Sequence, residues 1–256
     1  MARAAVPGRL TWRVATVKES KDETATARTL TLEVPGWPGH QPGQHVAVKL
    51  TAADGYSAQR DYSIASASEP DRLQITVQRL IDGEVSSYLA EAAESGDQFD
   101  VRGPIGGWFT WDPFDPRPLL LFAGGSGIVP LMSMIRTHAQ FRAPVPVRLI
   151  YSARTPADVI YLEELSQRQR VSPVTVTYLY TRSGWAARGI APARDAQSYT
   201  TRLNAKILAE TAFPPAAYPA TFVCGPSGFV EAASSLLVAA GHAPGAIKTE
   251  RFGPGG

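Results

Sequence analysis

A glycine cluster in the second half of the chain has the composition of an anion-binding turn. Leu119–Ala123 (LLLFA) is fully apolar and leads directly into Gly124–Gly127 (GGSG), with Pro130 in the helix-like turn that follows. Backbone amides in such a turn, together with the positive end of a helix, bind phosphate, and proline suits a first helical turn. A tight strand-to-helix turn without a ligand explains the same glycines, so the motif alone does not decide between the two.

Arginines follow the next two predicted strands, at the sheet edge where the glycine turn would lie. Ser152 and Arg154 come at the end of one strand, and Arg182 comes after the next. A Rossmann protein that selects NAD places Asp or Glu near this point, whereas a guanidinium fits a 2′-phosphate. The pair favours NADPH over NADH, and ordinary solvated surface arginines are the alternative.

The single cysteine, Cys224, ends another predicted strand and is followed by Gly225 and Pro226. By residue type alone it is a small buried hydrophobe. One cysteine allows no intrachain disulfide and cannot hold an iron–sulfur cluster, and the four histidines lack metal-ligand spacing. We therefore predict no metal site.

The first half of the chain places a cation beside an aromatic ring. In a strand, Arg60 and Tyr62 share one face, while Asp61 and Ser63 share the other. A cation for pyrophosphate and a flat ring suit a flavin nucleotide, although a plain strand with a core tyrosine has the same pattern. Further on, GEVSSYL at 83–89 opens a short helix with a glycine and serines, which suits an anion or a simple serine cap.

Short alternating segments, separated by Gly and Pro clusters, must position these first-half residues. They are typical of an antiparallel barrel or sandwich, and a helix-like spacing interrupts them at Val85–Ala93. Strands are predicted at Thr11–Val17, Thr24–Val34, His45–Leu50 and Leu73–Val77.

The second half alternates strands with helices, which predicts βαβ units and a parallel sheet. Three prolines in Trp111–Pro118 mark a boundary between domains 1–112 and 113–256. The expected fold is a two-domain α+β chain, with an N-terminal antiparallel Greek-key β-barrel followed by a doubly wound parallel α/β domain. Its strands are predicted at Leu119–Ala123, Val147–Ser152, Val174–Tyr180 and Thr221–Cys224, and its helices at Ile128–Ala139, Tyr161–Arg168, Leu203–Glu210 and Gly228–Ala240.

Composition limits the remaining possibilities. The chain has 256 residues, 44% of them hydrophobic, and a net charge of +2, so two domains fit and neither nucleic acid nor a membrane surface is indicated as a partner. The N-terminus carries no apolar signal segment, and the longest apolar run is too short to cross a bilayer. We expect a cytoplasmic protein, and nothing in the sequence demands more than a monomer.

The order of the motifs resembles that of the ferredoxin–NADP reductase superfamily. RDYS, VQR, GEVSSYL, GPIGGWF, GGSGIVPLMSMI, YSAR, TRS and CGPSG follow one another between Trp12 and Phe252. Bacterial ferredoxin/flavodoxin reductases and the reductase components of oxygenases are the members that it resembles. The resemblance implies an FAD-dependent enzyme that takes hydride from NADPH and passes electrons to a separate ferredoxin, flavodoxin or oxygenase component.

The resemblance also implies residue roles around FAD, which it favours over FMN. Arg60 would hold the FAD pyrophosphate, Tyr62 would stack on the isoalloxazine, and Ser63 would bond its N5 edge. Glu250 would handle a proton, and Phe252 would lie near the flavin. The other residues implied for the ribityl and phosphate path are Thr76, Val77, Arg79, Gly83, Val85, Ser86 and Ser87.

For the nicotinamide nucleotide, the resemblance brings Cys224 next to the nicotinamide ring. It makes Cys224, with Ser63 and Glu250, a candidate catalytic residue. The other residues implied for NADPH are Gly124, Gly125, Gly127, Pro130, Ser152, Arg154, Arg182, Gly225 and Pro226.

Other functions fit part of the pattern. A free flavin reductase would use flavin as a substrate, and FAD that stays tightly bound through purification would count against it. An electron-transfer flavoprotein subunit would not use nicotinamide, and the glycine turn and paired arginines count against that. A nucleotide-binding module without redox chemistry would be colourless. Arg188 and Arg194 could assist a 2′-phosphate, but the sequence assigns them no place.

Overall fold

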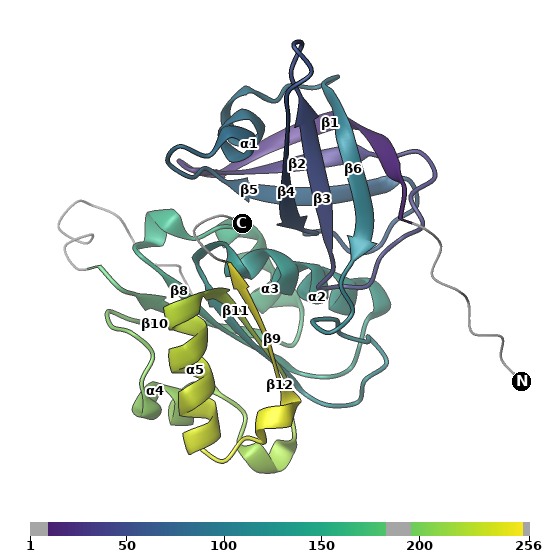
Figure 1. The fold of residues 1–256 in the computed structure, drawn as a ribbon. Coiled ribbons are helices and arrows are strands. Elements are labelled where there is room, and N and C mark those ends of the chain that lie inside the picture. The colour runs from purple at the N-terminus through teal and green to yellow at the C-terminus, as the bar shows by residue number, and fades with distance from the viewer. Residues whose placement is uncertain (1–9, 183–195, 253–256) are drawn as a thin grey trace, which may run out of the picture.

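The structure, a computed structural model, describes residues 10–182 and 196–252 as two lobes packed against each other (Figure 1). The first lobe holds strands β1 to β6 and the second holds β7 to β12. Arg188 and Arg194 lie outside the described residues. In the part of the chain that is described, no helix is both long enough and apolar enough to span a membrane.

The first lobe is a six-stranded antiparallel sheet rolled into a barrel. Its spatial order is β4-β3-β6-β1-β2-β5, and a bridge between Ile64 and Ile75 joins the end of β4 to β5. Alternate side chains of the strands point inward and form one apolar core. The elements are β1 (Trp12–Thr24), β2 (Ala27–Glu33), β3 (His45–Thr51), β4 (Ser57–Ser63), β5 (Arg72–Gln78), α1 (Glu84–Ser87), a π-helical turn (Tyr88–Ala92) and β6 (Gln98–Ile105).

The first strand is longer than the sequence pattern predicts. The predicted break after Val17 and the predicted new strand from Thr24 are both wrong, because β1 continues to Thr24 and β2 begins at Ala27. Beyond Val17, β1 pairs with β2 alone, and its side chains are mostly exposed. Without a buried face, this ribbon has no apolar alternation that could mark it as a strand.

The second lobe is a six-stranded parallel sheet with helices on both faces, as expected for a doubly wound domain. Its order is β10-β9-β8-β7-β11-β12. The chain steps outward from β7 to β10 and then returns to β11 beside β7. The elements are β7 (Leu119–Gly124), α2 (Ile128–Phe141), β8 (Val147–Ala153), α3 (Leu162–Val171), β9 (Val174–Tyr180), β10 (Gln197–Tyr199), α4 (Ala205–Thr211), β11 (Ala220–Pro226), α5 (Ser227–Ala239) and β12 (Ile247–Phe252).

Two apolar layers enclose this parallel sheet. Ile128 and Leu165, from α2 and α3, belong to the core on one face, while Ile207 and Leu237, from α4 and α5, belong to the core on the other. A strand covered on both faces has no polar side, which explains why Leu119–Ala123 is continuously apolar. β6, β10 and β12 had no sequence prediction, although Phe99 and Val101 of β6 alternate into the barrel core.

The helix layer formed by α4 and α5 can be tested with neighbouring residues of α5. Leu237 is fully buried, whereas Val238 is 44% exposed. We expect Leu237→Ala to lower the free energy of unfolding by about 2–5 kcal/mol, because it leaves a cavity against the sheet. Val238→Ala is the matched control, with an expected change within about 0.5 kcal/mol. Chemical denaturation measures both, and equal losses would contradict this packing.

Candidate active site

Two glycine turns interlock where the chain reverses its direction across the sheet, between β7 and β11. A Cβ atom on Gly127 would lie 2.2 Å from the carbonyl oxygen of Cys224, and one on Gly225 would lie 3.0 Å from Cα of Gly124. Close backbone approach therefore requires glycine at both positions. Gly125 has a φ of 55° and no described atom within 4 Å of a Cβ built on it. The turn thus has one packed side and one open side, at the sheet position where α/β proteins bind ligands.

Cys224 and Glu250 lie opposite each other in the register of β11 and β12. Cys224 is fully buried, and burial, with the nearby Glu250 carboxylate, raises the pKa of its thiol well above the usual value. Burial also raises the pKa of Glu250 to about 7. Its Oε2 atom has no hydrogen-bond partner among the described residues. The pair therefore consists of a neutral thiol and a carboxyl group that titrates near neutral pH.

A pocket beside these strand ends is lined by both lobes. Tyr62 and Ser63 come from the end of β4, Thr76 from β5, Val129 from α2 and Phe252 from β12. Tyr62 is partly buried, and burial raises the pKa of its phenol, so it is a neutral ring at physiological pH. The full lining is Asp61, Tyr62, Ser63, Thr76, Gln78, Leu80, Ser126, Val129 and Phe252. Flat rings and hydroxyl groups thus meet in one place.

Val77, Val85 and Arg60 were also predicted to bind flavin, but they do not line this pocket. Val77 and Val85 point into the barrel core, so only their backbone groups are available to a ligand. Arg60 is exposed on β4, and its guanidinium donates to the carbonyl of the adjacent Gln59 at 2.7 Å. Their proposed contacts with FAD stay predictions.

The polar groups before and within α1 mostly form hydrogen bonds with one another or with neighbouring residues. The Ser86 hydroxyl donates to the Gly83 carbonyl at 3.2 Å and accepts from the Leu80 amide at 3.3 Å. A Cβ on Gly83 would lie 2.3 Å from Ser86 Oγ, so the turn itself requires this glycine. The Arg79 guanidinium is hydrogen-bonded to Glu91. Ser87 is partly buried on the same helix, and all these roles toward a phosphate stay predictions.

Sequence reasoning missed several residues of the pocket, and for one of them a signal was available. Side chains alternate along β5, so Thr76 shares its outer face with Gln78, while Val77 points into the core. The alternation of the strand therefore favours Gln78 over Val77 as a pocket residue. No sequence pattern identifies Leu80, Ser126 and Val129 as pocket residues, because only the contact between the lobes brings them together.

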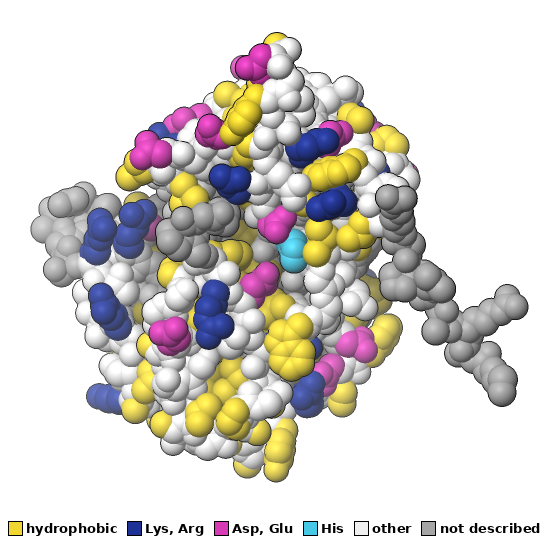
Figure 2. Space-filling model, viewed as in Figure 1, with side chains coloured by type: hydrophobic (Ala, Val, Ile, Leu, Met, Phe, Trp, Pro, Cys, Tyr) yellow, Lys and Arg dark blue, Asp and Glu magenta, His cyan; other side chains and the backbone are white. Residues whose placement is uncertain are grey.

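The predicted arginine pair lies at adjacent strand ends. The Arg182 amide donates to the Arg154 carbonyl at 2.9 Å, and Ser152 is next to Gly124 in the register of β8 and β7. The Arg154 guanidinium is 2.9 Å from Oδ1 of Asp158 on the same loop. Figure 2 shows Lys and Arg side chains on this side of the second lobe, where β8 and β10 lie.

Family comparisons match both lobes in order. Residues 4–110 match the oxidoreductase FAD-binding domain, and residues 121–235 match the oxidoreductase NAD-binding domain. The flavohaemoglobin-like FAD/NAD-binding domain of nitric oxide dioxygenase from Vibrio cholerae superposes with a TM-score of 0.80 at 26% identity. The superposition covers 94% of this chain and 99% of that domain.

The chain belongs to the ferredoxin–NADP reductase superfamily. Its first lobe is an oxidoreductase FAD-binding domain, and its second lobe is an oxidoreductase NAD-binding domain. A ferredoxin–NADP⁺ reductase from Neisseria gonorrhoeae shares the fold, with a TM-score of 0.75 at 21% identity. The superposition covers 95% of this chain and 99% of the Neisseria chain.

Similar curated proteins include reductase components of oxygenases. The glycine betaine monooxygenase reductase subunit of Pseudomonas aeruginosa is 32% identical over 220 residues, which is 84% of this chain and 56% of the relative. The ferredoxin reductase component of 3-ketosteroid-9-alpha-monooxygenase from Mycolicibacterium smegmatis is 31% identical over 245 residues, 92% of this chain and 64% of the relative. The chain thus spans a little over half the length of the first relatives that it matches.

The local geometry of the two lobes fits the FAD and NAD nucleotides for which these domains are named. The pocket between the lobes combines the rings of Tyr62 and Phe252 with the Ser63 hydroxyl, as a flat heterocycle with polar edges requires. The open side of the turn at Gly125 leaves room for a phosphate against backbone amides. Along the boundary between the lobes, Figure 2 shows acidic, basic and histidine side chains close together.

The Glu250 carboxyl makes the free energy of unfolding of the protein depend on pH. Its folded-state pKa of about 7 lies above the ordinary value of 4.5, so between these values the folded protein retains a proton that the unfolded chain has lost. Its contribution to stability is therefore full below pH 4.5 and is lost as the pH rises through 7. We expect Glu250→Gln to remove this loss when unfolding is measured by denaturant across that range. Glu163→Gln is the control, because the Glu163 carboxylate is exposed. Identical pH profiles for the wild type, Glu250→Gln and Glu163→Gln would contradict the raised pKa of Glu250.

Proposed function

We propose that the chain is an NADPH-dependent reductase that passes electrons to a separate redox protein, with FAD bound in domain 1–112 and NADPH in domain 113–256. The proposal rests on one observation: Tyr62, Ser63 and Phe252 lie beside the glycine turns at the boundary between the lobes. Hydride transfer needs the nicotinamide ring and the flavin ring in contact, and this boundary would bring them together. The acceptor would be a ferredoxin, a flavodoxin or an oxygenase component, and the oxygenase reductase relatives support an oxygenase component.

Bound FAD would accept hydride from the nicotinamide and supply electrons to the acceptor. Tyr62 would support the face of the isoalloxazine, and Ser63 would donate a hydrogen bond to its N5 edge. Cys224, neutral at physiological pH, would pack beside the nicotinamide as an uncharged thiol. Glu250, with its pKa near 7, could hold or release a proton there. In this scheme the residues of the chain orient the two rings and exclude water.

Absorbance spectroscopy tests this function. The purified reductase should show flavin absorption, which anaerobic NADPH bleaches much faster than NADH does. Flavin that dissociates readily and turns over as a substrate would indicate a free flavin reductase instead. A flavin spectrum that neither nucleotide bleaches would indicate an electron-transfer subunit. A protein without flavin, even after reconstitution, would contradict the proposal.

The choice of NADPH over NADH rests on Arg154 and Arg182, and Asp158 is the neighbour that modulates it. The Arg154 guanidinium bonds to Asp158, and a 2′-phosphate would have to replace that partner. We expect Arg154→Ala to raise KM for NADPH by about tenfold or more while NADH changes little, as loss of one charged hydrogen bond predicts.

Asp158→Asn is the opposing variant, because it removes a competing negative charge from the same loop. We expect it to lower KM for NADPH and leave KM for NADH nearly unchanged. Steady-state kinetics with both nucleotides measures these effects. Equal KM values for NADPH and NADH in the wild-type reductase would rule out the phosphate clamp.

A further inference from the structure

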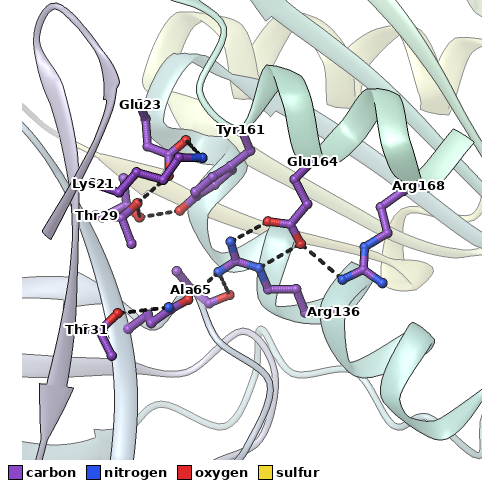
Figure 3. A network of polar contacts seen from close by, with 11 residues as sticks. Lys21, Glu23, Thr29, Thr31, Ala65, Arg136, Tyr161, Glu164 and Arg168 are labelled. Carbon is purple, nitrogen blue, oxygen red and sulfur yellow. Dashed lines mark hydrogen bonds and ion pairs between the residues drawn. The ribbon is translucent and has the colours of Figure 1, made fainter. Parts of the chain in front are cut away.

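A chain of hydrogen bonds crosses from the nucleotide-binding lobe to the barrel (Figure 3). The Tyr161 hydroxyl donates to Thr76 Oγ1, which lies 2.8 Å from Thr29 Oγ1. Thr29 in turn donates to Glu23 Oε1 at 2.9 Å, and Lys21 Nζ is 3.5 Å from the other carboxylate oxygen. If Thr76 donates to Thr29, every hydroxyl donates once toward Glu23. Such a chain is polarised by the carboxylate at its end.

The guanidinium of Arg136 packs against the face of the Tyr161 ring. It lies 4.9 Å from the ring centroid. It donates to the Ala65 carbonyl at 3.0 Å and to Gln74 Oε1 at 2.9 Å, both in the barrel lobe. It also bonds to Glu164 of α3, with contacts at 2.7 and 3.2 Å. The tyrosine is therefore held from both sides by groups that are themselves bonded.

The backbone of Tyr161 is consistent with a position fixed by its contacts. The residue is fully buried and adopts a left-handed φ of 62°, which a bulky side chain rarely does. Burial raises the pKa of its hydroxyl, so the group is a permanent donor at physiological pH. Strained residues of this kind persist only where the surroundings over-determine them.

Tyr161 ends the loop whose first residue, after β8, is Arg154. Thr76, its partner, lies on the outer face of β5 between Gln74 and Gln78. Gln78 and Thr76 both line the pocket between the lobes. One short loop therefore joins the predicted 2′-phosphate site to the strand that borders the predicted flavin site.

We propose that Tyr161 is a positioning residue for hydride transfer, whose hydroxyl ties the nucleotide-binding loop to β5 and so sets the distance between nicotinamide and flavin. This inference rests on the proposed function. Loss of the hydroxyl leaves the phosphate ligands and the flavin pocket in place, but it removes the hydrogen bond that joins Tyr161 to β5. It should therefore slow the transfer step more than it weakens nucleotide binding.

Tyr161→Phe tests this, since it removes one oxygen and keeps the ring under Arg136. Stopped-flow reduction of the FAD-loaded protein by NADPH should be about tenfold slower, with the dissociation constant for NADPH changed less than about twofold. Flavin content should equal that of the wild type. The split between rate and affinity is a result that simple loss of stability would not produce.

Tyr151→Phe is the matched control. Tyr151 is equally buried, and its hydroxyl accepts the Ile160 amide at 3.2 Å, so it braces the same loop within the nucleotide-binding lobe. Its reduction rate should stay within about twofold of the wild type. A wild-type rate in Tyr161→Phe, or an equal fall in both variants, would overturn the positioning role alone. Wild-type flavin that neither NADPH nor NADH reduces would overturn the proposed function, and this inference with it.

Discussion

The arrangement of the two lobes depends on the largely buried guanidinium of Arg136. It bonds to the carbonyl of Ala65, the amide oxygen of Gln74 and the carboxylate of Glu164, and thus joins the barrel to α2 and α3. Burial by itself would lower the pKa of Arg136, but its bonds to Glu164 and the neighbouring charges raise it. A buried ion pair stabilises a structure only when its remaining donors are satisfied. Here the backbone and amide acceptors of the barrel satisfy them, which makes the contact between lobes specific.

Two periodic faces meet at this contact. On α2, Val129, Ser133 and Arg136 share one side of the helix, and the Ser133 hydroxyl donates to the Ser66 carbonyl at 2.6 Å. On β5, Gln74, Thr76 and Gln78 share the outer side of the strand, while the residues between them fill the barrel core. Each face ends at the pocket that Val129 and Gln78 line. The polar contacts that hold the lobes together therefore also set the shape of the site between them.

Much of the fold follows from sequence periodicity. The alternation of strands with helices in the second half predicted the parallel sheet. Its strands are continuously apolar because strands covered on both faces have no polar side. The same reasoning failed for the outer half of β1, which is exposed, and for β6 and β12. Arg154 and Arg182 were predicted at one sheet edge, and their strand ends are adjacent.

The sequence by itself determined the fold class and the family, and the residue types at the strand ends. Those properties depend on local patterning, turn chemistry and the order of motifs. Only the tertiary structure decided which side chains share the pocket. It also decided that position 127 must be glycine because the Cys224 carbonyl lies against it, and that Tyr161 bonds to Thr76. These are contacts between residues far apart in the chain. Their partners are fixed by how the two lobes pack, and no periodicity within a single segment encodes that packing.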